Sequence, residues 1–127
     1  MSHVEVYVGE LRRSCEFWGW LLEGLGYEPY QSWEQGRSWR LGGTYLVFVQ
    51  TGADGLQAGY DRRRIGLNHL AFRVSDPAAV DRFTEELRGR GVRVLYQDRH
   101  PHAGGPDHYA VFFEDPDRIK VELVSDI

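Results

Sequence analysis

A repeat with an offset of 66 positions constrains the fold of this chain more than any other feature of the sequence. The segments His3–Val8 and His69–Val74 both alternate polar with apolar residues, which predicts two half-buried strands. At the same offset, further apolar positions coincide: Val8 with Val74, Phe17 with Phe83, and Leu21 with Leu87. Agreement over a strand and the segment after it indicates an internal duplication.

Each of the two strands is followed by an apolar stripe at helical spacing. The stripes consist of Leu11, Cys15, Trp18, Leu22 and Leu25, and of Val80, Phe83 and Leu87. Gly26 and Gly91 are suited to left-handed C-terminal caps, and Asp76 followed by Pro77 is typical of a helix start. We therefore expect helices over residues 11–25 and 76–90, with Cys15 buried by packing.

Three further strands are predicted after each helix, because alternating segments there are separated by turn residues. They lie near residues 27–33, 38–41 and 45–50, and near residues 92–97, 108–114 and 119–124. Each half thus reads β-α-β-β-β, and the chain is predicted to be α+β. We expect one domain over residues 1–127, with a first module at 2–51, a linker at 52–65 and a second module at 66–125. The arginine run at 62–64 is expected to be a solvated part of the linker.

Composition excludes several classes of partner. The 127 residues carry 15 Lys and Arg against 19 Asp and Glu, a formal charge of -4, so no basic surface for nucleic acid is expected. The single Cys15 cannot form an internal disulfide, which favours a reducing compartment. No apolar stretch approaches the roughly 20 residues of a membrane helix, and the first residues do not resemble a signal peptide. We expect a cytoplasmic protein without a membrane partner.

The alternation of polar and apolar residues also assigns the side chains of the strands at 3–8, 69–74 and 119–124 to two opposite faces. The apolar face must meet a helix, so His3, His69 and Glu122 fall on faces away from the helices. Such faces can simply be exposed to water, as in many antiparallel sheets. The face of residues 46, 48 and 50 is too apolar for that, so we expect a curved sheet around a partly polar cavity. Its predicted lining consists of Trp39, Arg40, Tyr45, Phe48, Gln50, Arg73 and His108.

Three segments, residues 3–8, 66–72 and 113–122, resemble the vicinal oxygen chelate superfamily. This superfamily includes glyoxalase I, fosfomycin-resistance proteins, bleomycin-binding proteins and extradiol dioxygenases. The resemblance covers nearly the whole chain and implies two β-α-β-β-β modules in a half-open barrel, or cup. It also implies a divalent-metal site of His3, His69 and Glu122. Two imidazoles and a carboxylate suit Zn, Fe, Mn, Ni or Co and leave positions open for substrate oxygens.

Two departures from the family pattern leave the subfamily open. Glyoxalase-like members place a fourth ligand, a Glu, on the last strand of the first module, where this chain has Phe48 and Gln50. Phe48 cannot bind a metal, whereas Gln50 could. Extradiol dioxygenases carry a Tyr ahead of the Glu ligand, and Phe112 occupies that place here.

Further candidates surround the predicted site. Glu5 follows His3 on the same face and is a candidate base or partner of a ligand, and Tyr109 is a candidate for substrate contact. The loop at 97–108 is either a lid or an exposed loop, and a separate metal site at His100 and His102 is disfavoured by its flexibility. Arg40 and Arg73 suit an anionic or carbonyl-bearing ligand, or surface ion pairs.

Two functions follow from these predictions. The first is a metal-dependent lyase, isomerase or dioxygenase, in which the ion polarises an oxygen of a small substrate. The second is a metal-free protein of the bleomycin-resistance type that sequesters a flat aromatic molecule between Trp and Tyr side chains. A homodimer is expected in either case, because short strands leave edges that family members commonly cover by association.

Overall fold

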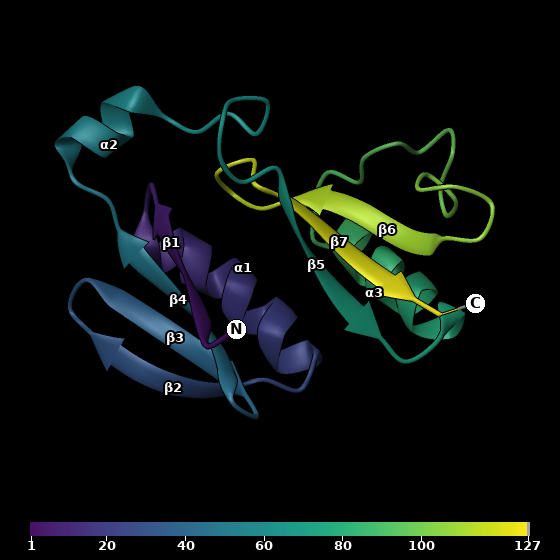
Figure 1. Ribbon diagram of the computed structural model, residues 1–127, viewed down its shortest axis with the longest axis horizontal. Helices are drawn as coiled ribbons and strands as arrows, with labels where there is room; N and C mark the ends of the chain where they lie inside the picture. Colours follow the sequence, from purple (N-terminus) through teal and green to yellow (C-terminus); the bar gives the residue numbers. More distant parts are fainter. Residues whose placement is uncertain (127) are drawn as a thin grey trace. The chain divides into compact units, whose positions relative to one another are not determined.

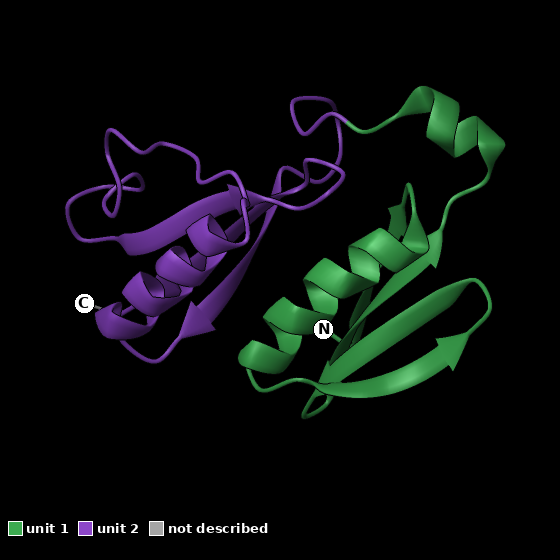
Figure 2. Cartoon of the chain, turned by 180° about the vertical axis from the view of Figure 1, so that it is seen from behind, with its two compact units in different colours: residues 1–60 green, residues 61–127 purple. Residues whose placement is uncertain are grey.

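The computed structural model describes residues 1–126. The chain divides into two compact units, residues 1–60 and residues 61–127 (Figure 2). Each unit contains one sheet and one long helix that lies along one face of that sheet (Figure 1). The predicted α+β class is confirmed by this arrangement.

The first unit contains a four-stranded sheet with the order β1-β4-β3-β2. Its strands are β1 His3–Val8, β2 Glu28–Trp33, β3 Gly36–Leu41 and β4 Thr44–Gln50. Strand β1 runs parallel to β4, and the other pairs are antiparallel. Helix α1, Leu11–Gly24, connects β1 to β2 and packs on β2, β3 and β4.

The second unit repeats this plan with β5 His69–Val74, helix α3 Pro77–Gly89, β6 Tyr109–Glu114 and β7 Lys120–Ser125. Its sheet has the order β5-β7-β6, and β5 is again parallel to the last strand. The strand predicted at 92–97 is reduced to one antiparallel bridge between Val94 and Phe113. Beyond Leu95, whose amide donates to the Phe112 carbonyl, the chain turns away through Tyr96 at φ 55°.

The ends of α1 and α3 show how closely the halves correspond. Gly26 and Gly91 both adopt positive φ, and the amides of Tyr27 and Val92 each donate a hydrogen bond of 2.9 Å back into the last helical turn. The Asp76 carboxylate accepts the Ala79 amide at 2.8 Å, which caps the start of α3. The predicted helix boundaries are therefore confirmed to within two residues at each end.

The predicted linker contains a short helix, α2 Ala53–Ala58, that contributes no buried residue. Arg62, which was expected to be solvated, donates to the Glu114 carboxylate at 2.6 Å and to the Arg118 carbonyl at 3.0 Å. None of the helices within residues 1–126 is long and apolar enough to cross a membrane.

The core of each unit lies between its helix and its sheet. In the first unit, Trp18 of α1 stacks on Phe48 of β4 with ring centroids 4.9 Å apart, and both side chains are fully buried. Trp39 of β3 donates its indole N–H to Glu23 at 3.1 Å. In the second unit, Val80 and Leu87 of α3 are buried together with Phe113, Val121 and Leu123 of the sheet. Both helix-covered faces are thus filled with large apolar side chains.

Candidate functional site

His69 and Glu122 meet on the face of the second sheet that α3 does not cover. Strands β5 and β7 are parallel, and Val121 and Leu123, the neighbours of Glu122, point to the buried helix side. The Nε2 atom of His69 lies 3.1 Å from the Oε1 atom of Glu122. Only 7% of the Glu122 side chain is exposed, against 32% for His69. A nearly buried carboxylate therefore faces an imidazole that solvent can reach.

Asn68 determines which nitrogen of His69 faces this carboxylate. The Asn68 amide nitrogen donates to the Arg62 carbonyl at 3.2 Å, which directs its Oδ1 atom toward His69. His69 Nδ1 lies 2.8 Å from that oxygen and must therefore donate to it. In a neutral imidazole the Nε2 lone pair then points at Glu122, so a cation is needed there, either a second proton or a metal ion.

His108 contacts the other oxygen of the same carboxylate. Its Nε2 atom lies within hydrogen-bond distance of Glu122 Oε2, and its ring stacks on Phe112 with centroids 6.4 Å apart. Phe112 is the register partner of Glu122 and contacts the His69 ring edge-on at 6.1 Å. The three polar side chains thus form one cluster above a single buried aromatic ring.

The loop that carries His108 packs on this open face. Leu95, Ala110 and Phe112 form a small buried cluster, and Tyr96, Ala103 and Val124 pack against it. The Ala110 amide donates to the Pro101 carbonyl at 3.0 Å, which ties the loop to the edge of β6. The loop is therefore folded onto the sheet, and a lid function for it stays a prediction.

The first sheet carries a different set of side chains on its open face. His3 stacks on its register partner Tyr45 with centroids 4.6 Å apart and rings 8° from parallel. Tyr30 contacts Tyr45 edge-on at 5.3 Å, and the Arg40 guanidinium lies 4.3 Å from the Tyr30 ring centroid. Glu5 is exposed and shares the face of His3. We define His3, Tyr45, Tyr30 and Arg40 as the aromatic row.

Three residues predicted to line a cavity lie instead on the face that α1 covers. Phe48 and Trp39 belong to the core described above. The Gln50 side chain is bound to the turn before α1, because its Oε1 accepts the Leu11 amide and its Nε2 donates to the Gly9 carbonyl, both at 2.9 Å. We therefore leave these three residues out of the proposed site.

Side chains along β6 alternate between the two faces of the sheet, and Tyr109 lies on the face that α3 covers. Its hydroxyl donates to Asp81 of α3 at 2.6 Å. This hydrogen bond, together with burial and the Asp81 charge, raises the pKa of Tyr109. The phenol is thus held as a neutral donor on the face opposite to Glu122.

Arg73 lies beside the His108 end of the cluster. It forms an ion pair of 2.6 Å with Asp126, and both side chains are largely exposed. A surface pocket of about 550 Å³ is lined here by Arg73, Asp107, His108, Val124, Ser125 and Asp126. The cluster therefore adjoins a space of substrate size with a cationic group at its wall.

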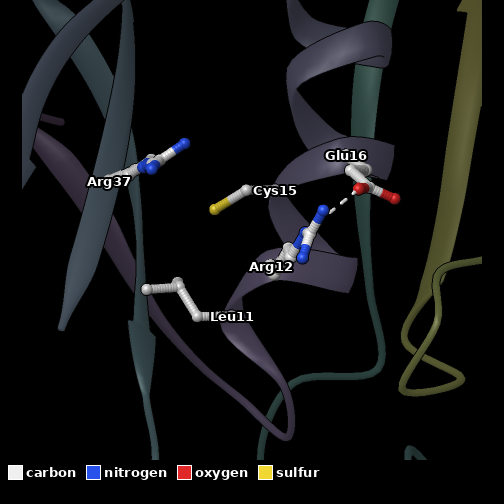
Figure 3. A pocket seen from close by; sticks show the side chains of 5 residues that line it. All are labelled: Leu11, Arg12, Cys15, Glu16 and Arg37. Carbon is white, nitrogen blue, oxygen red and sulfur yellow. Dashed lines mark ion pairs between the residues drawn. The ribbon is translucent and has the colours of Figure 1, made fainter. Parts of the chain in front are cut away.

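A second pocket, of about 390 Å³, lies in the first unit (Figure 3). Leu11 and Cys15 point into it, and Arg12 on its wall pairs with Glu16 at 3.7 Å. Cys15 is 8% exposed, and burial raises the pKa of its thiol against the opposing charge of Arg37. The thiol is accordingly a packing group, and none of the predicted site residues lines this pocket.

The donor atoms of His69 and Glu122 fit adjacent positions around a metal ion. Two ligand atoms that each lie about 2.1 Å from an ion are separated by about 3.0–3.4 Å in octahedral or tetrahedral geometry, and the observed separation is 3.1 Å. Within residues 1–126, no group of three or more His, Cys, Asp or Glu side chains is arranged to hold a metal. The His69 and Glu122 pair therefore fits a metal ion, whereas His3 as a third ligand stays a prediction.

Sequence reasoning missed the role of Asn68 and assigned His108 only to a cavity lining. Asn68 directly precedes the predicted ligand with which β5 begins, which is a signal that a search for orienting side chains could use. The contact between His108 and Glu122 depends on the path of the loop, which the local pattern of polar and apolar residues does not specify.

Comparisons with known proteins agree with this architecture. Residues 1–123 match the model of the Glyoxalase/Bleomycin resistance protein/Dioxygenase superfamily. The uncharacterized protein YqjT of Bacillus subtilis (strain 168) is 56% identical over 125 residues, which are 98% of each chain. A crystal structure from Bacillus halodurans, provisionally described as a glyoxalase, is 55% identical with a TM-score of 0.97, and the match covers 98% of this chain and 94% of that one.

A more distant structure shares the fold. A mutant of the fosfomycin resistance protein FosX from Listeria monocytogenes, complexed with Mn(II) and 1S,2S-dihydroxypropylphosphonic acid, is 20% identical with a TM-score of 0.73. The match covers 100% of this chain and 92% of that chain. Because the family match spans nearly the whole sequence, the chain belongs to the glyoxalase/bleomycin resistance protein/dioxygenase superfamily, as the resemblance implied.

Proposed function

We propose that the protein is a divalent-metal-dependent enzyme of lyase, isomerase or dioxygenase type that acts on a small oxygen-bearing substrate. The observation that carries this proposal is the orientation of His69. Its Nδ1 is engaged by Asn68, and its Nε2 atom faces the buried Glu122 carboxylate at 3.1 Å. A metal ion bound by both groups would satisfy this arrangement and would supply Lewis-acid activation of a substrate oxygen.

The residues around the pair have defined tasks in this proposal. Asn68 fixes the ring orientation and tautomer of His69, as partners of metal-binding imidazoles commonly do. Burial of Glu122 keeps water from competing for its oxygens. Arg73, at the wall of the neighbouring pocket, suits a carbonyl or anionic group of the substrate once its exposed pair with Asp126 opens. Mn(II) in the FosX complex supports a divalent ion of this class.

The test is the metal content of the purified protein, followed by titration with Mn(II), Co(II), Ni(II) and Zn(II). We expect about one ion per chain in the wild type. His69→Ala removes an imidazole ligand, and Glu122→Gln keeps the shape but removes the charge, so both should weaken binding by orders of magnitude. His100→Ala is the matched control, because it removes a histidine that lies near Arg88 and Asp81 of α3 and does not contact Glu122. Wild type and variants with equally little metal would contradict the proposal.

His3 as the third ligand stays a prediction, and His3→Ala tests it in the same titration. Loss of affinity comparable with that of His69→Ala would support it. An unchanged affinity would limit His3 to the aromatic row and would leave the His69 and Glu122 pair as the centre of the proposed site. A homodimer and a cytoplasmic location also stay predictions, and light scattering of the purified protein tests the first of these.

A metal-free binding protein is the second candidate, and the aromatic row favours it. His3 and Tyr45 are already stacked, and Tyr30 with Arg40 extends the row along the open sheet face. Such a surface suits a flat aromatic molecule. Quenching of intrinsic fluorescence by bleomycin tests this: binding that Tyr45→Ala weakens and Glu122→Gln leaves unchanged, in a protein without metal, would favour this candidate over the enzyme.

A further inference from the structure

We propose that His108 is a positioning residue that holds the Glu122 carboxylate in the orientation for binding the metal ion. This inference rests on the proposed function and assigns a residue outside the predicted ligand set. His108 lies 14 positions before Glu122, at the end of the loop that packs on the open face of the second sheet. It acts through Glu122 and is not itself proposed as a ligand.

The contact pattern around Glu122 gives each carboxylate oxygen a separate partner. Oε1 faces His69 Nε2, and Oε2 accepts from His108 Nε2. The terminal torsion of a Glu side chain is broad and roughly two-fold, so a carboxylate without a second partner turns readily. A donor on Oε2 therefore keeps Oε1 directed toward His69. Hydrogen bonds of this kind to ligating carboxylates tune the affinity for metal.

The ring of His108 has two close neighbours. Phe112 stacks on it, and Gly104 lies so near that a side chain there would meet the ring. A Cβ atom added at Gly104 would lie 2.8 Å from His108 Cγ, a distance that real Cβ contacts essentially never show. Gly104 does not have a positive φ, so alanine is compatible with its backbone and would act mainly by displacing the ring.

The loop backbone around Gly104 is held in place by its own contacts. Ala103 packs on the cluster of Leu95, Ala110 and Phe112. The His108 amide donates to the Gly105 carbonyl at 3.1 Å, and His102 Nδ1 lies 3.2 Å from the His108 carbonyl. The loop backbone is thus fixed on both sides of the ring. A methyl group at position 104 is therefore expected to move the imidazole more than the loop.

This steric relation gives a test that leaves every candidate metal ligand in place. Co(II) titration of the purified full chain, followed by visible absorption, measures affinity and the geometry around the ion without any substrate. His108→Ala should weaken Co(II) binding about 10–100-fold, the range found for lost orienting partners. Gly104→Ala should weaken binding in the same direction by less. His108→Gln, whose amide can donate near the place of Nε2, should restore part of the affinity.

Two controls separate positioning from general damage. Gly89→Ala adds a methyl group in the same unit where no atom lies within 4 Å, and His100→Ala removes an imidazole of the same loop that lies near Arg88 and Asp81 of α3. Both should bind Co(II) as the wild type does. Thermal unfolding of every variant reports folding, and Gly104→Ala and His108→Gln carry the test if His108→Ala does not fold.

The outcomes separate the two levels of the proposal. A wild type that binds no divalent ion overturns both the proposed function and this inference. A wild type that binds Co(II), with His108→Ala and Gly104→Ala equal to it, overturns only the role of His108. A loss in His108→Ala as large as that in His69→Ala would make His108 a direct ligand and would also overturn the positioning role.

Discussion

The open faces of the two sheets share one strand arrangement, β1-β4-β3 and β5-β7-β6, but have opposite environments. On the first sheet, His3, Glu5 and Tyr7 are exposed, and the histidine makes a stacking contact with Tyr45. On the second sheet, the loop at 95–108 covers the open face, and His69 faces the carboxylate of Glu122, a residue that is 5% exposed. Duplication supplies two similar scaffolds, but among the described residues only the second has a buried carboxylate and a packed loop on its open face.

The distribution of buried charge shows the same asymmetry. Among the described residues, the buried carboxylates Glu114, Asp115 and Glu122 all belong to the second unit, and the buried polar groups of the first unit are Ser14 and Ser38. Buried carboxylates are stable only with partners, and here arginines, backbone amides and histidines supply them. The second unit therefore depends on polar networks that the first unit does not need.

Phe112→Ala should have the largest effect on stability, because it removes the ring on which the loop packs. Large-to-small changes at buried aromatic positions cost about 3–5 kcal/mol. Tyr45→Ala, on the corresponding face of the first sheet, removes a partly exposed stacking partner and should cost about 1 kcal/mol. Urea denaturation measures both changes. Equal losses would break the contrast between a covered and an uncovered face.

Arg62→Met should lower the free energy of unfolding by about 1–3 kcal/mol at pH 7, because it takes a charged donor from Glu114. Burial opposes ionisation of Glu114, but Arg62 and Arg118 outweigh it and lower the pKa below the usual 4.5. The stabilisation is therefore present above the unfolded pKa and is lost as the pH falls through the folded pKa.

The difference between wild type and Arg62→Met should accordingly shrink in acid, and urea denaturation at pH 7 and pH 3 measures it. Arg63→Met is the matched control, because Arg63 is largely exposed and pairs only with the surface carboxylate of Asp61. A constant difference across this pH range would show that the buried carboxylate of the second unit does not depend on Arg62.

Tyr109→Phe should have the smallest effect and sharpens the comparison between the two faces of a single sheet. Tyr109 follows His108 in sequence but donates to Asp81 on the α3 side. Loss of one such hydrogen bond costs about 1 kcal/mol, and Co(II) affinity should stay at the wild-type value. Weaker Co(II) binding in this variant would place Tyr109 in the site and contradict the assignment of the faces.

Sequence reasoning predicted those helices and strands in which apolar residues recur at regular spacing and whose ends carry capping residues. Strands β1 and β5 alternate cleanly, so the faces of His3 and His69 were predictable from the two-residue period of a pleated strand. Strand β4 is different, because Leu46, Val47 and Phe48 are all buried and no alternation remains. Its faces follow only from the parallel register with β1, which sequence reasoning did not have.

The polar cluster was only partly predictable for a related reason. Glu122 alternates with Val121 and Leu123, which identifies its face, but β6 reads Val111, Phe112 and Phe113 without a polar marker. The face of Tyr109 was therefore undetermined. The path of the chain from Leu95 to His108 depends on tertiary packing, since turns and one bridge replace the regular strand that was expected there.

The way in which Gln50 is bound has a consequence for the evolution of this scaffold. Its amide joins the end of β4 to the turn before α1, so a carboxylate at this position would lose the donor to Gly9 and strain the turn. Val47, by contrast, pairs with Glu5 on the face of His3. Every valine codon is one nucleotide change from an acidic codon. A single substitution could therefore place a carboxylate on the face of His3 at position 47, with both Gln50 hydrogen bonds kept unchanged.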